Sequence, residues 1–324
     1  MMKNDKTLIG IIITHVDDFI HCGDCIFEET VMKPLLQRFL AGRVASGKFK
    51  YIGLNILQTE KHEIYLDQNE YSSSIEEPVI TGNKNDKVDL SAEEYTTFRA
   101  LVGAMNWLVC GSRPDLAYDL LEHSTKFKKA TKSDLSQCIR SVRKCKKETV
   151  VNKFSCLELG LPMKLILFSD ASFANLPDSV SSSLGYVIFM ADCNGKCSTI
   201  SWRSNKIRRI CRSTLAAESM ALIEGLEESL YIQSVLDELG FLHTITAIVD
   251  SKSLHDAIHS TKLVDDKRLR IDIASIQELV QQKKAIIKWS PAEKQLANAL
   301  TKRGASPAHL LEVLRLGSIK AYLD

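Results

Sequence analysis

The 324-residue sequence lacks a long apolar run. No stretch reaches the roughly 20 consecutive apolar residues that a transmembrane helix needs, so no membrane partner is expected. Two lysines precede the run LIGIII, but this run is too short for a secretory signal and is soon followed by Asp17 and Asp18. We therefore expect an intracellular protein, cytoplasmic or nuclear, that is not secreted.

A cysteine framework, internal repeats and low-complexity tracts are also lacking. The nine cysteines are an odd number and are scattered along the chain. Cys22 lies near Cys25, and Cys193 near Cys197, but neither pair is matched by a second Cys or His pair at zinc-site spacing. The cysteines are therefore interpreted as reduced, small apolar residues of an intracellular protein.

The sequence has little net charge, formally +2, but its charge is unevenly distributed. Residues 126–162 hold ten basic and three acidic residues. Such a segment is a candidate surface for nucleic acid, with Lys144, Lys146 and Lys147 as contacts. From the residues alone, a solvated helix face explains the segment equally well.

A second basic cluster precedes a predicted helix that begins near residue 214. Its members crowd one strand and the turn that follows it, and they are Arg203, Lys206, Arg208, Arg209 and Arg212. Charge on an edge strand can serve only to block pairing with other chains. Basic side chains at this place can also bind phosphates, and the sequence favours a mixture of the two roles.

Three apolar segments each carry one carboxylate. Asp170 follows a predicted strand over residues 165–168, and Asp250 follows another over residues 246–249. Glu218 lies in the first turns of a predicted helix that Ser213 or Thr214 would cap. Acids at the ends of buried strands are costly unless something neutralises them. Together, the three acids predict a site for a divalent ion such as Mg²⁺, which prefers oxygen ligands.

Each acid also has an ordinary interpretation. Asp170 could cap the turn that follows it, Glu218 could be an exposed helix glutamate, and Asp250 could cap the next helix. Taken singly, these interpretations would be preferred for Asp170 and Glu218. The three acids together favour the metal site.

The pattern of elements predicts two domains, over residues 1–150 and residues 163–324. In the second, the order is strand, strand, strand, helix, strand, helix, strand, helix. In the first, Ser91 and Glu94 form a capping box at the start of a helix. The other elements expected there are strands over 7–14, 19–26, 49–57 and 63–67, and helices over 29–41, 71–76 and 134–147.

The motifs resemble copia-type LTR retrotransposon Pol polyproteins. Strand-Asp, helix-Glu, strand-Asp is the order of a ribonuclease H domain, and SDASFAN, ISWRSNK, STLAAESMAL and KQLANALTK resemble the copia version of it. HVDD at residues 15–18 resembles the catalytic turn of a reverse transcriptase. FKYIGLNI, LDQNEY and FRALVGAMNWLVCGSRPDLA resemble segments downstream of that turn in a copia-type polymerase. The resemblance covers essentially the whole chain.

This resemblance implies a fold and an activity. Residues 163–324 would form an α/β ribonuclease H-like mixed sheet with flanking helices. Residues 1–150 would be a truncated α+β reverse-transcriptase region: the end of the palm, the thumb and the connection. The implied activity is hydrolysis of the RNA strand of RNA–DNA hybrids with two Mg²⁺ or Mn²⁺ ions. Asp170 and Asp250 would bridge the metals, and Glu218 would ligate one and orient the water.

The sequence departs from the family pattern at the fourth metal position. The family usually shows Ala-Asp-x-Leu-Thr-Lys on the last helix, whereas this chain has Asn298 in place of the acid. Asn298 offers a carbonyl oxygen without charge, so the second metal should bind more weakly. Asp272 is a candidate substitute, although a structural role suits it better.

The sequence also departs from the family pattern in the region that resembles a polymerase. His15 replaces the usual Tyr of the catalytic turn, and the third palm carboxylate normally lies upstream of it. Asp17 and Asp18 alone cannot hold two Mg²⁺ ions in octahedral geometry, so they are predicted to be vestigial and polymerase activity is not expected. Two alternatives stay open: a decayed or repurposed remnant that binds nucleic acid or protein, and a subunit that completes a polymerase with Pol-derived partner chains.

Overall fold

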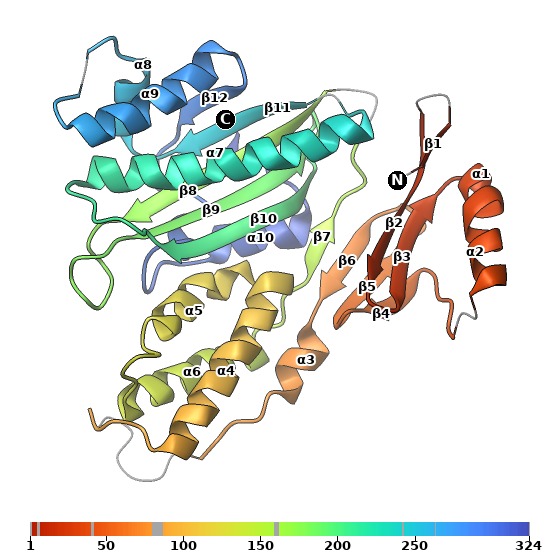
Figure 1. The fold of residues 1–324 in the computed structure, drawn as a ribbon, viewed down its shortest axis with the longest axis horizontal. Helices are drawn as coiled ribbons and strands as arrows, with labels where there is room; N and C mark the ends of the chain where they lie inside the picture. Colours follow the sequence, from red (N-terminus) through yellow and green to blue (C-terminus); the bar gives the residue numbers. More distant parts are fainter. Residues whose placement is uncertain are drawn as a thin grey trace.

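The computed structural model describes residues 2–4, 7–39, 42–79, 87–158, 162–241, 243–262 and 264–323. Its largest unit is a five-stranded sheet with helices on both faces (Figure 1). The strands and helices of this unit are β8 (Met163–Ser172), β9 (Ser183–Ala191), β10 (Cys197–Lys206), α7 (Thr214–Leu239), β11 (His243–Val249), α8 (Lys252–His259), α9 (Lys267–Gln281), β12 (Ala285–Trp289) and α10 (Ala308–Leu316).

The strand order across this sheet is β10-β9-β8-β11-β12. Strands β8, β9 and β10 form an antiparallel meander, whereas β11 pairs in parallel with both β8 and β12. Strand β8 is central and buried on both faces, which explains its nearly continuous apolar run. The mixed sheet with this strand order is the ribonuclease H-like fold that the sequence predicts. Two helices, α8 and α9, occupy the β11–β12 connection where one was expected.

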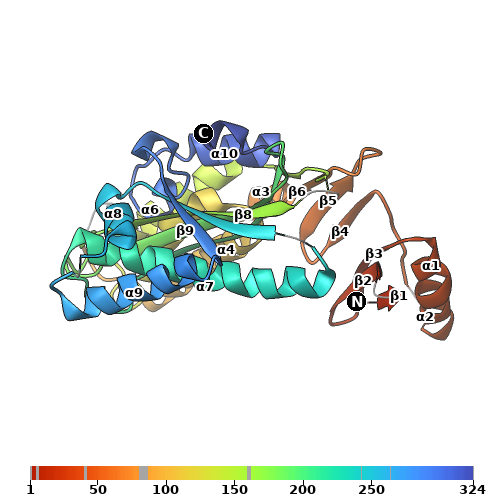
Figure 2. The same cartoon turned by 90° about the horizontal axis from the view of Figure 1, so that it is seen from above.

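The two faces of the sheet belong to different hydrophobic cores. Leu165 and Leu167 of β8 pack toward α7, in a core that also contains Leu222 and Leu226. The alternate residues Ile166 and Phe168 pack into a second core on the opposite face, together with residues of α10. Figure 2 shows the sheet between α7 and α10. This alternation follows from the period of two residues along a strand.

A helical region completes the second core. It consists of α4 (Ala92–Gly111), α5 (Ala117–Ser124) and α6 (Lys132–Lys147), with a 3₁₀ turn, η2 (Pro114–Leu116), between the first two. Phe98, Met105 and Leu108 of α4 are in the same core as Phe168 of the sheet. Ser91 and Glu94 form the predicted capping box at the start of α4. The helical region and the ribonuclease H-like sheet therefore share one hydrophobic core.

Two smaller sheets precede the helical region. One has the order β1-β2-β3 and the other the order β4-β5-β6-β7, with α3 (Asn69–Ser74) after β6. The strands are β1 (Met2–Asn4), β2 (Thr7–His15), β3 (Asp18–Gly23), β4 (Lys48–Tyr51), β5 (Leu54–Gln58), β6 (Ile64–Asp67) and β7 (Asn152–Phe154). Strand β7 lies in the segment 150–162 between the two predicted domains, and it pairs with β6. The division of the chain into two domains stays a prediction.

Several local predictions in this region were wrong. Residues 24–26, expected in a strand, lie in or next to α1 (Cys25–Phe27), which runs through a π-helical turn (Glu28–Met32) into α2 (Lys33–Arg38). Pro34 is the second residue of α2 and lies inside the continuous helical segment that begins at Cys25. A proline there removes one backbone donor and crowds the preceding turn, and the π-helical turn lies directly before it. The expected strand 49–57 is a hairpin of β4 and β5, with Ile52 and Gly53 at positive φ in its turn.

The expected loop over residues 74–91 lies partly outside the described residues. Within the described residues, no helix is long and apolar enough to cross a membrane.

Candidate active site

Asp170 lies on the central strand β8, paired with Gly185 of β9. Its side chain is fully buried. Burial raises the pKa of this carboxyl group, and the nearby ammonium of Lys302 partly opposes the increase. The side chains that donate hydrogen bonds to it belong to a distant segment of the chain, and not to the turn that Asp170 could have capped.

Glu218 lies in the second turn of α7, the helix that Ser213 caps by accepting a hydrogen bond from the Ala216 N–H. The cap and the apolar residues around Glu218 direct this part of α7 against the sheet. Glu218 is 6% exposed, so it is not an ordinary surface glutamate. Burial, followed by repulsion from Asp170 and Asp250, raises its pKa to about 9.

Asp250 directly follows β11, the parallel neighbour of β8. It does not cap the next helix, because Ser251 accepts the capping hydrogen bond from the Leu254 N–H. Burial and the charge of Asp170 raise the pKa of Asp250 to about 6. The indole N–H of Trp289 donates a 2.9 Å hydrogen bond to the Asp250 carbonyl. Trp289 is 45% exposed and is not part of the core.

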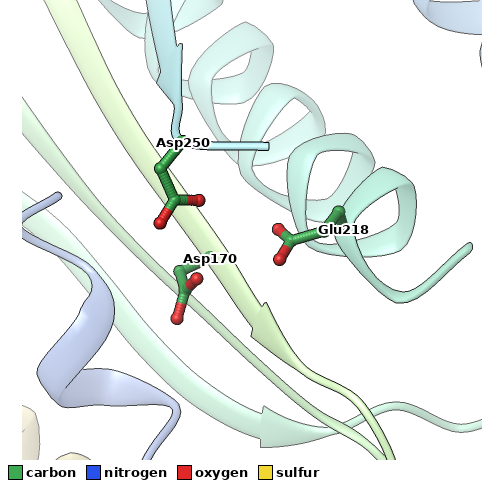
Figure 3. Close-up of side chains that lie close together, drawn as sticks. All are labelled: Asp170, Glu218 and Asp250. Carbon is green, nitrogen blue, oxygen red and sulfur yellow. The ribbon is translucent and has the colours of Figure 1, made fainter. Parts of the chain in front are cut away.

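The three carboxylates converge (Figure 3). One oxygen from each of Asp170, Glu218 and Asp250 lies within 4.8 Å of the others, and we call these residues the acidic triad. Carboxylate oxygens are the ligands that Mg²⁺ and Mn²⁺ prefer. The raised pKa values show that the triad resists full ionisation when no divalent cation is present. The residues therefore fit a divalent metal ion.

A 3₁₀ turn, η4 (Asn298–Leu300), brings three further side chains to the triad. The hydroxyl of Thr301 donates to Asp170 Oδ2. Lys302 Nζ lies 3.2 Å from Asp170 Oδ2 and 2.8 Å from Asn298 Oδ1. Asn298 therefore reaches the edge of the site, in a 3₁₀ turn and not on the last helix, and its carbonyl oxygen accepts from an ammonium group.

Gly185 permits this approach of η4 to the sheet. A Cβ atom at Gly185 would lie 2.6 Å from Leu300 Cβ and 3.1 Å from the Leu300 carbonyl oxygen. The first distance is shorter than Cβ contacts in real proteins, and the second is tighter than most and involves backbone that cannot easily move. A side chain at position 185 would therefore push Thr301 and Lys302 away from Asp170.

Sequence reasoning missed several of these contacts. Lys302 and Thr301 were part of a recognised motif but received no role. Gln295 was not considered, yet its buried amide donates to the carbonyls of Ser169 and Ile248, at 3.0 and 3.4 Å. This amide therefore joins the ends of β8 and β11 next to Asp170 and Asp250. The only signal for these residues was their position in the motif KQLANALTK.

Asp272 does not join the triad. It lies on α9 and forms an ion pair with Arg209. Within the described residues, the only group of three or more acidic, His or Cys side chains suited to a metal is the acidic triad. This arrangement agrees with a structural role for Asp272.

Asp17 and Asp18, which were predicted to be vestigial polymerase residues, lie apart from this site, in the β2–β3 hairpin. Asp17 is in the two-residue turn, and Asp18 begins β3 opposite His15. Both are exposed. Among the described residues, no third acid, His or Cys forms a metal-binding group with them.

Some of the basic residues that were predicted to contact nucleic acid already form hydrogen bonds or ion pairs with other described residues of the protein, whereas others do not. Lys146 donates to the Ile75 carbonyl at 2.9 Å and lies 3.4 Å from Glu77. Lys206 pairs with Asp178 at 2.9 Å. Arg203 lies over the ring of Tyr186, and Lys144 is half-buried. Of the predicted contacts, Arg203, Lys206, Arg208, Arg212 and Lys147 are exposed.

Comparison with known proteins gives sequence relatives but no match to a family model. The chain is 27% identical over 210 residues to the retrovirus-related Pol polyprotein from transposon RE1 of Arabidopsis thaliana, covering 64% of this chain and 14% of that protein. It is 23% identical over 319 residues to the corresponding RE2 protein, covering 93% of this chain and 21% of that protein. The chain thus spans about a fifth or less of the length of these two relatives.

A third relative is secreted RxLR effector protein 161 of Plasmopara viticola, 30% identical over 135 residues, covering 42% of this chain and 90% of that protein. Among solved structures, a foamy viral protease-reverse transcriptase in complex with RNA/DNA hybrid matches 89% of this chain and 36% of its own, with 10% identity and a TM-score of 0.48. LC11-RNase H1, isolated from compost, matches 43% of this chain and 92% of its own, with 20% identity and a TM-score of 0.33.

The sequence relatives and the fold agree. The alignment with RE2 extends over almost the whole chain. The strand order of the large sheet is that of ribonuclease H, and the three acids occupy neighbouring strand ends and the facing helix. The chain is therefore similar in sequence to retrovirus-related Pol polyproteins of transposons, and its large sheet has a ribonuclease H-like fold.

Proposed function

We propose that this chain hydrolyses the RNA strand of RNA–DNA hybrids in a reaction that depends on Mg²⁺ or Mn²⁺. The observation that carries this proposal is the convergence of the acidic triad, with one oxygen of each carboxylate within 4.8 Å of the others. Buried carboxylates at this separation repel one another, so the arrangement is costly unless a cation is bound. The ribonuclease H-like fold makes hydrolysis of a hybrid the preferred reaction.

The residues of the site have separable roles in this proposal. A bound divalent ion would supply Lewis-acid activation of water and stabilise the leaving oxygen. Asp170 and Asp250 would hold it from adjacent parallel strands, and Glu218 would complete the site and orient the water. Gln295 and Trp289 would keep the strand ends in place, because both donate hydrogen bonds to main-chain carbonyls there.

Substrate contact would come from the exposed basic side chains near the site. Arg203 and Arg208 lie on the strand and turn that lead to α7, the helix that carries Glu218. They would bind phosphates and position the hybrid without reading its sequence. Choice of the RNA strand would depend on its 2′-hydroxyl groups, which only one strand of a hybrid presents in the minor groove.

The reverse-transcriptase-like region over residues 1–150 is proposed to have no polymerase activity of its own. Asp17 and Asp18 are two exposed acids on a hairpin, and two acids there do not form an octahedral site for two ions. The helical region would instead support the ribonuclease H-like sheet, because the two share a hydrophobic core.

One observation favours a second function, binding without catalysis. Asn298 carries no charge, and its carbonyl oxygen is already bound by Lys302. A remnant of a Pol polyprotein that binds nucleic acid or protein would tolerate this loss of an acidic ligand. The intact acidic triad opposes this alternative.

The experiment that separates the two functions is cleavage of an end-labelled RNA–DNA hybrid by the purified chain. Cleavage with Mg²⁺ or Mn²⁺ is expected for the wild type, and its loss is expected for Asp250→Asn, which removes one charge at nearly constant volume. Single-stranded RNA and the all-DNA duplex should stay uncut. Binding of the hybrid without cleavage at any metal concentration would leave the remnant function as the better account.

A further inference from the structure

The acidic triad has a positively charged neighbour within the chain, the ammonium group of Lys302. Lys302 Nζ lies 3.3 Å from Oδ1 and 3.2 Å from Oδ2 of Asp170. This ammonium group therefore contacts both oxygens of the carboxylate that was predicted to bridge two metals. A carboxylate that bridges two ions uses both of its oxygens, so the contact bears on how many ions the site can hold.

Asn298 holds the ammonium from the other side. Its Oδ1 accepts a 2.8 Å hydrogen bond from Lys302 Nζ, while its Nδ2 donates to the Ala292 carbonyl at 2.9 Å. The second bond fixes which end of the amide faces the site. The only ligand atom that Asn298 could offer a metal is therefore bound to Lys302.

Thr301 engages Asp170 as well. Its hydroxyl donates to Oδ2, the same oxygen that lies 3.2 Å from Lys302 Nζ. Asp170 and Thr301 are both completely buried, and an ion on this side would have to displace the ammonium group of Lys302 from Asp170. Mg²⁺ keeps several of its waters when it binds. Toward Glu218 and Asp250, the interactions of the described residues include no side-chain donor to Asp170; the donor there is the main-chain N–H of Ala171.

The charges of the site also favour the binding of a single divalent ion. When ionised, the acidic triad carries three negative charges, and Lys302 supplies one positive charge. One divalent ion neutralises what remains, whereas a second would leave two uncompensated positive charges in a largely buried place. Uncompensated charge is strongly unfavourable in such surroundings.

We infer that Lys302 holds the place of a second divalent ion, so that the site binds one ion, between Asp170, Glu218 and Asp250. This inference rests on the proposed function in one respect, that the acidic triad is the metal site. It replaces the two-metal prediction from the sequence with one ion and one ammonium group.

The test is to count the ions that the full chain binds. Mn²⁺ is titrated by calorimetry, and electron paramagnetic resonance then shows whether bound ions are isolated or spin-coupled, as two ions about 3.5–4 Å apart would be. The wild type should bind one isolated Mn²⁺. The double variant Lys302→Met, Asn298→Asp removes the ammonium and adds a carboxylate, so it should bind a second, coupled Mn²⁺ at least tenfold more tightly than the wild type does.

Two variants serve as controls. Lys302→Arg keeps the positive charge and should still bind one ion. Lys164→Met removes a lysine from the far end of the same strand, about 20 Å from Asp170 by the rise of an extended chain, and should leave the count at one. Thermal unfolding checks that each variant folds. If Lys302→Met does not fold, Lys302→Gln takes its place in the double variant, since its amide can still donate to Asp170.

Each outcome bears on a separate claim. Two coupled ions in the wild type, or a single ion in the folded double variant, would overturn the role of Lys302. One isolated ion in the wild type and two in the double variant would support it, even if no hybrid were cleaved. The proposed ribonuclease function would fail in that case, while the metal count would stand.

Discussion

The indole N–H of Trp202 donates a 2.8 Å hydrogen bond to the main-chain carbonyl of Val109, and this bond joins β10 of the ribonuclease H-like sheet to the end of α4. It lies at the border of the hydrophobic core that both regions share. A second contact at this border runs from Asn175 Nδ2 to the hydroxyl of Tyr118, at 3.1 Å. The helical region therefore helps to support the sheet that carries Asp170.

This relationship predicts the effect of Trp202→Phe. The substitution keeps an aromatic ring but removes the N–H that donates to the Val109 carbonyl, so the free energy of unfolding should fall by about 1 kcal/mol. Urea denaturation of the full chain measures the change. The sheet and α4–α6 should unfold in a single transition in both proteins. Two separate transitions in the wild type would contradict a shared core.

A substitution in a buried ion pair of the helical region should lower the free energy of unfolding more than Trp202→Phe does. Arg113 and Asp115 pair at 2.8 Å with both side chains almost fully buried, and Arg113 also donates to the carbonyls of Cys145 and Glu148. Asp115→Asn leaves the guanidinium without its charged partner, so we expect a loss of about 3–5 kcal/mol.

The matched control is an exposed ion pair, Lys33 with Glu29, which lies at 2.5 Å on the surface of the N-terminal helical segment. Glu29→Gln should change the free energy of unfolding by less than about 1 kcal/mol. Equal effects of the two substitutions in urea denaturation would show that burial of Arg113 and Asp115 does not control the outcome.

The acidic triad predicts a pH dependence of stability. The pKa of Glu218 is raised to about 9 and that of Asp250 to about 6, so the folded chain binds these protons more tightly than the unfolded chain. This contribution is present at low pH and is lost as pH rises through those values. A divalent ion favours the ionised carboxylates, so the increase in Tm caused by Mg²⁺ should be larger at pH 8 than at pH 6.

Differential scanning fluorimetry with and without Mg²⁺ measures this difference. Glu218→Gln removes the carboxyl group whose pKa is raised to about 9, so the metal-free stability of this variant should depend less on pH above pH 7. An increase in Tm that is the same at both pH values in the wild type would mean that Mg²⁺ does not displace protons from the triad.

Cleavage of the RNA–DNA hybrid by the variant Asn298→Asp tests the fourth metal position. A carboxylate next to Lys302 adds negative charge at the edge of the site, so cleavage of the hybrid should increase at low Mg²⁺, by about tenfold for each 1.4 kcal/mol of added metal affinity. Asp250→Asn in the same background should abolish cleavage. No change in an already fully active wild type would show that position 298 does not limit metal binding. Inactivity of every variant would favour the remnant function.

Salt dependence tests which basic side chains contact nucleic acid. The logarithm of the hybrid affinity should fall linearly with the logarithm of salt concentration, with a slope of about −0.9 per phosphate contact. Arg203→Glu with Arg208→Glu should flatten the slope if these residues bind phosphates. Lys144→Glu with Lys147→Glu tests α6 in the same way.

Lys146 is left unchanged in these variants, because it is engaged by Ile75 and Glu77 and its loss would disturb the fold. Lys164→Glu, at the far end of β8, is the matched control and should leave the slope unchanged. An unaltered slope in either double variant would assign those two residues to the solvated surface.

The order of elements and the three acids could be predicted from the sequence. Local patterns report these features because burial of one or both faces imposes a period on a strand or helix, and the caps at Ser91 and Ser213 mark where helices begin. The local pattern failed where a short element interrupted an apolar stretch, as in the β4–β5 hairpin. A turn of two residues at positive φ gives little signal when one of them is Ile52.

Only the tertiary structure decided what surrounds Asp170. Lys302 and Thr301 are 132 and 131 residues away along the chain, and their contacts depend on the path of η4 across a sheet whose strands are not in chain order. The hydrogen bond from Trp202 to Val109, which joins the helical region to the sheet that carries Asp170, also depends on this long-range packing. The sequence by itself determined the acids, because their local context is readable. The number and charge of their neighbours depend on long-range packing, which no local pattern encodes.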